Sequence, residues 1–523
     1  MDTDNLISQL PDHIIHHILS FLSTPEVVRL SVLSKAWHQV FTSFPMFEFC
    51  SSSFEKISDN SFEFIVFVYK SLLLQCSQYR SIPKFQFSFT QDRRRPYVYS
   101  KYLLLPCELD KLISRCIEIG TRKGVKELSI YFCMPRYYRL PEALLSVKEL
   151  VVCSLGGCIF DGAINWPSLR ELSLKEVQIC DQRIIDDLFF TCPLIEKFSL
   201  VQCFGLKYLH LSGLRKLKKV KVKSGYPHME KIEINVLSLH TFSYSAHHYM
   251  KTDIDLTSCK NLEVFKFKGY NITEDMIQYL NRNFPALKVL VLHGERLHFQ
   301  RIEISIPLLE KLNLIVAQIS AVEAIINTPR LRSLQCVMHK IPSLFYLNSL
   351  QEVSLELFVD LHYIKHGESF LEDFREYLKN LNQIKLETLS ICVYSSSVIH
   401  KIVSSTASNP VLLDICHLKL ETFTREKESH ALVDGLFCIC RPESLLLVSG
   451  CARNDEFIKN LCKKLVQIEN ATTYASCWQN HLKGVRIQHC GRKGYNKILT
   501  CEAFLDSLRT LEPKEKIRFL FEW

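Results

Sequence analysis

The sequence is poor in glycine and proline, with 16 and 18 among 523 residues, and it has no long apolar run. So few turn-forming residues exclude a collagen-like or low-complexity chain. A membrane-spanning helix needs about 18 or more consecutive apolar residues. The best candidate, residues 64–74, is shorter and contains Lys70. We therefore expect no membrane span.

Paired C-x-x-C motifs are also missing, although the chain has 21 cysteines. The closest pairs, Cys438/Cys440 and Cys153/Cys158, have spacings that suit zinc poorly. The first ten residues carry two aspartates and lack the basic segment and apolar run of a secretory signal. The thiols are therefore expected to be reduced, in a protein of the nucleus or cytoplasm, and to act as small buried hydrophobes. The sequence predicts no metal site and no bound cofactor.

Common catalytic motifs are absent as well. We find no G-x-S-x-G elbow, no G-x-x-x-x-G-K-[ST] phosphate loop, no H-E-x-x-H and no G-x-G-x-x-G. The formal net charge of +9, from 64 Lys+Arg and 55 Asp+Glu, is mild for this length. It permits an acidic partner and does not point to nucleic acid. These absences favour a non-catalytic protein.

What is present begins with residues 10–41, LPDHIIHHILSFLSTPEVVRLSVLSKAWHQVF. Pro11 and Asp12 open a first helix, and Ser23 to Glu26 form a second start signal. Apolar residues recur at helical spacing in the first helix: Ile14, Ile15, Ile18, Leu19 and Leu22. Three short helices cannot bury all their apolar side chains among themselves. Apolar surface is therefore left for a partner or for the rest of the chain.

This segment resembles the F-box family. The matching residues are Leu10-Pro11, Ile14-Ile15, Ile18-Leu19, Leu22, Pro25-Glu26, Ser31 and Leu33-Ser34-Lys35-x-Trp37. The resemblance implies docking to a Skp-type adaptor, and through it to the cullin and RING subunits of a ubiquitin ligase. The implied adaptor contacts are Leu10, Pro11, Ile14, Ile18, Leu22, Leu30, Leu33 and Trp37. Ile15, Leu19 and Val28 are instead expected to pack the three helices together.

The rest of the chain repeats an L-x-x-L-x-L motif. Copies begin at Val125, Val147, Leu169, Ile195, Leu217, Leu239, Leu262, Leu287, Leu309, Leu331 and Leu350. Most gaps are 22 residues, the period of a leucine-rich repeat. Looser copies follow near Leu386, Leu418, Glu443 and His481. A first strand is expected at residues 84–89, and convex-side helices at 107–120 and 181–192. A single unit cannot bury its own apolar face, so the stacked units must share one core.

An F-box followed by repeats resembles the plant F-box/leucine-rich-repeat family. The resemblance implies an α/β fold, in which a three-helix F-box precedes a horseshoe-shaped solenoid with parallel strands on its concave face. We expect an F-box over 1–48, a helical linker over 49–81, leucine-rich repeats over 82–440, and terminal repeats with a C-terminal cap over 441–523. The last segment lacks a clean match to the short domain that many members carry there.

The function implied by the resemblance is a substrate-recognition adaptor of an SCF-type cullin–RING ubiquitin ligase, with the repeats binding a target protein. Two alternatives stay open. One is a hormone-sensing F-box receptor, since some related plant proteins hold a hormone between the repeats and the target. The other is an F-box scaffold that acts outside a ubiquitin ligase.

Positions three, five and seven of each repeat point to the concave face if the strands are parallel. In the repeat that starts at Leu217 these positions are lysines, and other basic residues occur further on. The candidate target-binding residues are Lys219, Lys221, Lys223, Lys266, Lys268 and His293. One interpretation is a basic patch that binds an acidic or phosphorylated segment of the target. The other is the solvated charged face of a lysine-rich protein.

Overall fold

The structure is a computed structural model of the 523-residue chain, which divides into two compact units, Met1–Asn261 and Leu262–Trp523. The residues that it describes are 10–19, 21–22, 26, 30, 37, 39, 47–54, 61–78, 82–90, 106–122, 124–134, 136–225, 229–246, 251–297, 301–319, 323–338, 344–347, 354–360, 388–393, 413–422, 437, 440–449, 461–466, 481–490, 496–507 and 516–523.

The first helix, α1 (Asp12–Leu19), is where the sequence predicts it. The carbonyl of Pro11 accepts hydrogen bonds from the amides of Ile14 (2.9 Å) and Ile15 (3.2 Å), which close the first turn. The proline suits this position because its missing N–H would have no partner inside the helix. Glu26, Leu30, Trp37 and Gln39 are also helical.

The parallel sheet of the first unit begins earlier than predicted. Strand β1 (Glu48–Cys50) pairs in parallel with β2 (Lys84–Thr90), so the sheet does not start at residues 84–89. Helices α4 (Ser51–Phe54) and α5 (Ser61–Gln78) lie between these strands, in the segment predicted as a helical linker. Phe49 explains the early strand, because it is 1% exposed and packs edge-on against Phe85.

Seven parallel strands follow one another from β2 on. The later ones are β3 (Glu127–Cys133), β5 (Val152–Gly156), β7 (Glu171–Lys175), β9 (Lys197–Val201), β11 (Lys219–Lys223) and β13 (Thr241–Ser245). Buried and more exposed side chains alternate along them, as a strand with one face in the core requires. The parallel pairing confirms the predicted leucine-rich-repeat solenoid.

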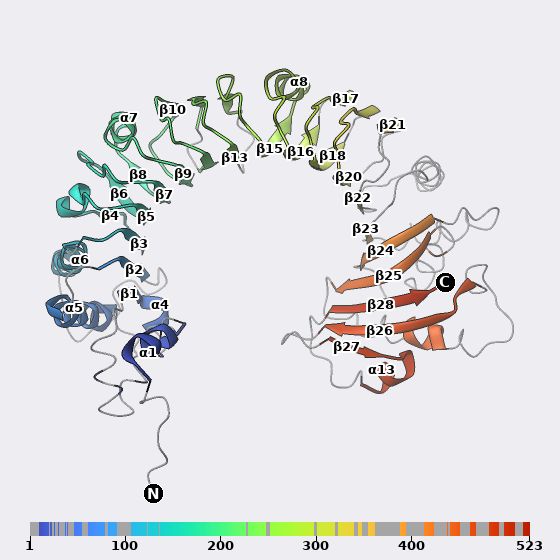
Figure 1. Ribbon diagram of the computed structural model, residues 1–523, viewed down its shortest axis with the longest axis horizontal. Helices are drawn as coiled ribbons and strands as arrows, with labels where there is room; N and C mark the ends of the chain where they lie inside the picture. Colours follow the sequence, from blue (N-terminus) through green and yellow to red (C-terminus); the bar gives the residue numbers. More distant parts are fainter. Residues whose placement is uncertain are drawn as a thin grey trace, which may run out of the picture. The chain divides into compact units, whose positions relative to one another are not determined.

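Helices and short strands cover the other side of this ladder (Figure 1). Helices α6 (Pro106–Thr121) and α7 (Gln182–Thr191) are the two that the sequence predicts, and the Asp181 carboxylate caps α7 by accepting from the Arg183 amide at 2.9 Å. The other outer elements are β4 (Tyr138–Arg139), η2 (Glu142–Ser146), β6 (Cys158–Phe160), β8 (Gln178–Ile179), β10 (Tyr208–Ser212), β12 (Lys231–Asn235) and β14 (Asp253–Asp255).

One predicted repeat start is wrong. Leu150, not Val147, precedes β5 by the two residues that separate Leu169 from β7. Val147 instead ends the 3-10 helix η2. The sequence motif misleads because Cys153 pairs with Leu172 in the ladder and is 1% exposed. A buried thiol fills the place that the motif assigns to a leucine or valine.

The second unit contains its own parallel ladder. Its successive strands are β15 (Val264–Ile272), β16 (Val289–Leu297), β18 (Lys311–Ile319), β20 (Ser333–Met338), β22 (Ser354–Asp360), β23 (Thr388–Val393), β24 (Leu413–Thr422) and β25 (Cys440–Ser449). Helix α8 (Glu274–Asn283) and a second parallel sheet accompany them. That sheet consists of β17 (Arg301–Ile304), β19 (Glu323–Ile326) and β21 (Leu344–Leu347).

The chain ends in antiparallel strands, so the expectation of further repeats near His481 is wrong. Strand β28 (Lys516–Glu522) lies antiparallel to both β25 and β26 (Gly484–Cys490). Strand β27 (Asn496–Leu499) is antiparallel to β26, and α13 (Cys501–Ser507) follows it. Repeats of the predicted kind need parallel neighbours. The Trp523 indole N–H donates to the Pro442 carbonyl at 2.8 Å and ties the end of the chain to β25.

Candidate interaction surfaces

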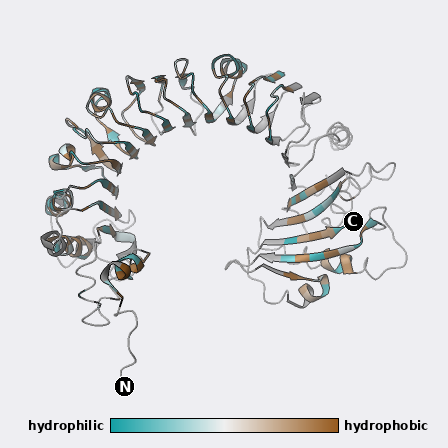
Figure 2. Cartoon of the chain, in the orientation of Figure 1, coloured by the Kyte–Doolittle hydropathy of each residue, from teal (hydrophilic) through white to brown (hydrophobic). Residues whose placement is uncertain are grey.

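One side of α1 presents apolar side chains to solvent. The side chains at every fourth residue are exposed by 36% to 41%: Leu10, Ile14, Ile18 and Leu22. This spacing places them on one face, because residues four apart lie one above the other on a helix. Pro11 is exposed as well. Figure 2 shows the hydrophobic colour of α1. Five of the eight predicted adaptor contacts thus form one accessible apolar stripe.

The opposite side of α1 belongs to the core. Ile15 is 3% exposed and Leu19 is 1% exposed. Both are residues that the sequence assigns to internal packing. Leu30 and Trp37, two further predicted adaptor contacts, are half-buried. Leu33 and Val28 lie outside the described residues.

Phe21 extends the apolar stripe, and the sequence analysis missed it. Its side chain is 76% exposed, more than any other residue of the stripe. Its ring meets the His17 ring edge-on, with centroids 5.0 Å apart. Phe21 follows Ile14 by seven residues and Ile18 by three, so helical spacing alone could have identified it.

Strand β11 carries three predicted target-binding lysines in alternation with buried valines. Lys219 and Lys221 are exposed and Lys223 is half-buried, whereas Val220 and Val222 are at most 1% exposed. Within the described part of the chain, no carboxylate forms an ion pair with these three lysines. Their neighbours differ, because Lys197 pairs with Glu171 at 2.5 Å and Lys218 pairs with Glu196 at 3.0 Å.

The other predicted target-binding residues lie in the second unit. Lys266 and Lys268 are exposed on β15, on either side of Phe267. His293 of β16 is half-buried and pairs in register with Lys268. The predicted set therefore consists of two clusters, one in each unit.

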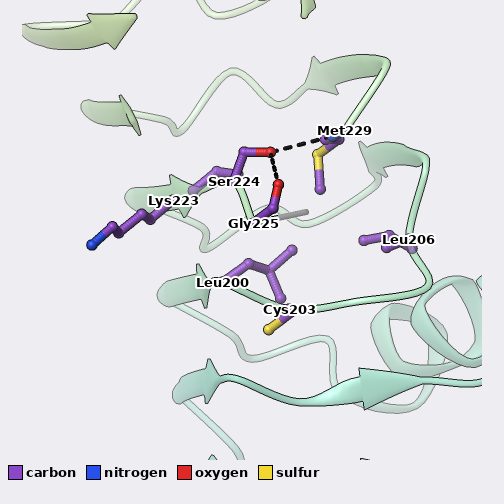
Figure 3. Close-up of a pocket in the computed structure, with 8 residues that line it drawn as sticks. Leu200, Cys203, Leu206, Lys223, Ser224, Gly225 and Met229 are labelled. Carbon is purple, nitrogen blue, oxygen red and sulfur yellow. Dashed lines mark hydrogen bonds between the residues drawn. The ribbon is translucent and has the colours of Figure 1, made fainter. Parts of the chain in front are cut away.

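A small hollow lies behind the end of β11 (Figure 3). It is lined by Leu200, Cys203, Leu206, Val222, Lys223, Ser224, Gly225 and Met229. The Ser224 hydroxyl accepts from the Met229 amide at 3.2 Å, and the Lys223 side chain points away from the hollow. The empty space of about 230 Å³, part of it open to solvent, is below the roughly 300 Å³ at which ligand pockets begin.

Burial keeps the thiols of the repeats in their neutral form. It raises the pKa of Cys203, in the wall of this hollow, to about 11 and that of Cys158 to about 12. A thiolate is the reactive form of cysteine, so these side chains are poor nucleophiles and poor metal ligands. No three histidines, cysteines or acids come together as a metal site in the described ranges. None of the described helices is long and apolar enough to cross a membrane.

Comparisons with known proteins match both parts of the chain. Residues 7–49 match the F-box domain, and residues 113–267 match the model described as FBD-associated F-box protein At5g56370, LRR repeats. F-box/LRR-repeat protein 25 of Arabidopsis thaliana is 28% identical over 227 residues, which is 42% of this chain and 75% of that protein.

Two further relatives come from the same plant. Putative F-box/LRR-repeat protein At5g02930 is 27% identical over 226 residues, 42% of each chain. Putative FBD-associated F-box protein At5g22720 is 30% identical over 202 residues, 38% of this chain and 40% of that protein. The matched region thus spans less than half the length of these two relatives.

The parallel ladders and the repeat match define a leucine-rich-repeat solenoid, and residues 7–49 add an F-box. The chain is an F-box/leucine-rich-repeat protein, similar to plant members of that family. The resemblance seen in the sequence motifs is therefore confirmed. Proteins of this kind generally act as substrate adaptors of SCF-type ubiquitin ligases.

Proposed function

We propose that this protein is the non-catalytic substrate-recognition subunit of an SCF-type cullin–RING ubiquitin ligase. The observation that carries the proposal is the apolar stripe on α1. Its members are between 36% and 76% exposed on one helix face. Each large apolar side chain that a partner buries contributes about 1.5–3 kcal/mol. A partner that covers the stripe therefore gains several such contributions.

In this proposal the stripe binds a Skp-type adaptor, which in turn binds the cullin and RING subunits. Leu10, Pro11, Ile14, Ile18 and Leu22 make the contact, and Leu30, Leu33 and Trp37 complete it. The chain performs no chemistry of its own. By holding a target beside the ligase, it raises the effective concentration of the target lysines at the site of ubiquitin transfer.

The lysines on the solenoid strands are proposed to bind the target. Lys219, Lys221 and Lys223 are accessible on β11, and Lys266, Lys268 and His293 lie on β15 and β16. An acidic or phosphorylated segment suits such residues, because charge-assisted hydrogen bonds are the stronger kind. We expect target binding to weaken as salt concentration rises.

A pull-down with a Skp-type adaptor tests the first half of the proposal. The wild-type chain should retain the adaptor, whereas Leu10→Ala/Pro11→Ala and Trp37→Ala should not, since losing an anchor costs about 2 kcal/mol or more. Leu237→Ala is the matched control, because Leu237 is 67% exposed and lies outside the stripe. Thermal denaturation of each variant checks its folding. Retention of the adaptor by folded Leu10→Ala/Pro11→Ala would contradict the proposal.

Target capture tests the second half. Proximity labelling with the F-box deleted should trap targets without destroying them. The triple change Lys219→Glu, Lys221→Glu and Lys266→Glu should remove those targets from the labelled set and leave adaptor binding intact. An unchanged labelled set would show that the target binds elsewhere.

A further inference from the structure

A row of serines crosses the strands of the first unit. Ser129, Ser154, Ser173 and Ser199 occupy the central position of β3, β5, β7 and β9, and adjacent members are paired in register. We call these four residues the serine row. The next residue in the same register is Lys221 of β11, followed by Ser243 of β13.

The hydroxyls of the serine row have no partner in the protein. All four serines are half-buried, and none of their hydroxyls forms a hydrogen bond with another described residue. The backbone of the same strands is already used in the parallel ladder. A serine hydroxyl can both donate and accept, so the row offers hydrogen bonds to a ligand whatever the direction of its groups.

Longer side chains flank the row, and contacts between strands hold them in place. On one side Glu171 of β7 pairs with Lys197 of β9 at 2.5 Å. On the other side the Lys175 ammonium lies 4.6 Å from the ring centre of Tyr131. The ring reaches across β5 because Gly156 has no side chain, since a Cβ there would lie 2.3 Å from the ring.

The row ends at a concentration of positive charge. On β9, β11 and β13 no acid occurs, and Lys197 is already paired with Glu171. Lys219, Lys221 and Lys223 have no such carboxylate among the described residues. Lys221 lies between Ser199 and Ser243, so an ammonium group and two hydroxyls meet at one place on the sheet.

We propose that an extended segment of the target lies along the serine row and places a phosphorylated side chain at Lys221. This inference rests on the proposed function and specifies its target class. From Ser129 to Lys221 there are four strand intervals of about 4.8 Å, or about 19 Å, which an extended segment of about six residues spans. A phosphate fits this end because it brings nearly two negative charges and three acceptor oxygens to lysines and hydroxyls.

The test is a peptide library applied to the full chain. One library carries a fixed phosphoserine with six degenerate residues on its N-terminal side, a second has them on the C-terminal side, and a third carries unmodified serine. We expect selection from one of the two phosphorylated libraries and none from the third. Selection of unmodified peptides to the same extent, or no selection at all, would overturn the inference.

Fluorescence anisotropy with the best selected peptide then locates the site. Lys221→Glu should weaken binding about 10- to 100-fold, the range expected for losing a hydrogen bond to a charged group. Ser173→Leu should weaken it comparably, because it blocks the row without changing charge. The matched controls are Lys216→Glu, an exposed lysine in the turn before β11, and Ser212→Leu, an exposed serine on β10. Equal losses in variant and control would overturn the site.

Adaptor pull-downs with the same proteins separate the two proposals. A chain that selects phosphopeptides but never binds an adaptor contradicts the ligase function and supports the serine row. A chain that binds the adaptor but shows no loss on Lys221→Glu or Ser173→Leu contradicts the serine row alone.

Discussion

Ile18 and Leu19 are neighbours in the chain, yet Ile18 is 41% exposed and Leu19 is 1% exposed. The two side chains are isomers of each other and lie on the same helix. Their different surroundings arise because successive residues of a helix point about 100° apart, and only one side of α1 meets the core. The pair therefore separates the contribution of α1 to folding from its proposed contribution to adaptor binding.

Ile18→Asp should leave the thermal stability nearly unchanged and reduce adaptor affinity at least about tenfold, since it places a charge in an apolar contact. Leu19→Asp should instead destabilise the protein by about 3 kcal/mol or more, because an unpaired carboxylate would replace a buried leucine. Thermal denaturation and adaptor binding distinguish the two effects. If Ile18→Asp bound the adaptor like the wild type, the stripe would not be the docking face.

Phe21→Ala should weaken adaptor binding without changing stability, because the ring is 76% exposed before any partner binds. Exposed aromatic residues within an apolar patch are common binding hot spots, so we expect a loss of about 1–2 kcal/mol. Calorimetry with the purified adaptor measures it. Phe190→Ala is the control, since Phe190 is 89% exposed on α7, outside the stripe. An equal loss in both variants would contradict a specific role for Phe21.

Gly157 is required by the close packing of successive repeats. Its φ of +63° is in the left-handed region, and a Cβ there would lie 1.7 Å from the Phe132 carbonyl oxygen. Gly157→Ala should therefore destabilise the protein by about 3 kcal/mol or more. Gly213→Ala, at a φ of +73° but with nothing within 4 Å, should cost only about 1–2 kcal/mol. Chemical denaturation gives both values, and equal losses would show that the contact with Phe132 is unimportant.

Native cysteines should differ sharply in their reaction with iodoacetamide. Burial raises the pKa of Cys158 and of Cys440 to about 12, so at pH 8 both remain protonated and shielded. Cys180 is exposed and should react first. Peptide mapping by mass spectrometry should show Cys158 and Cys440 modified only after unfolding, when their pKa values return to about 8.5. Rapid modification of Cys440 in the folded protein would contradict its burial.

Much of this molecule is legible in its sequence because the patterns are local and periodic. The leucine spacing identifies the repeats, and helical spacing predicts α1, α6 and α7, since a side chain must be apolar wherever its element faces the core. Failures occur where another residue takes over a role. Cys153 replaces a leucine and hides the true start of its repeat at Leu150. Phe49 starts the sheet from a segment too short to show a period.

The sequence by itself determined the class of fold, the apolar composition of the F-box segment and the positions of lysines on the strands, since each follows from spacing along one element. Tertiary structure decided which of those residues are accessible. It buried Leu19 and left Ile18 and Phe21 exposed, turned the end of the chain into antiparallel strands, and aligned Ser129, Ser154, Ser173 and Ser199 beside Lys221. Residues more than twenty positions apart become neighbours only when strands pair in register, and no local pattern encodes that alignment.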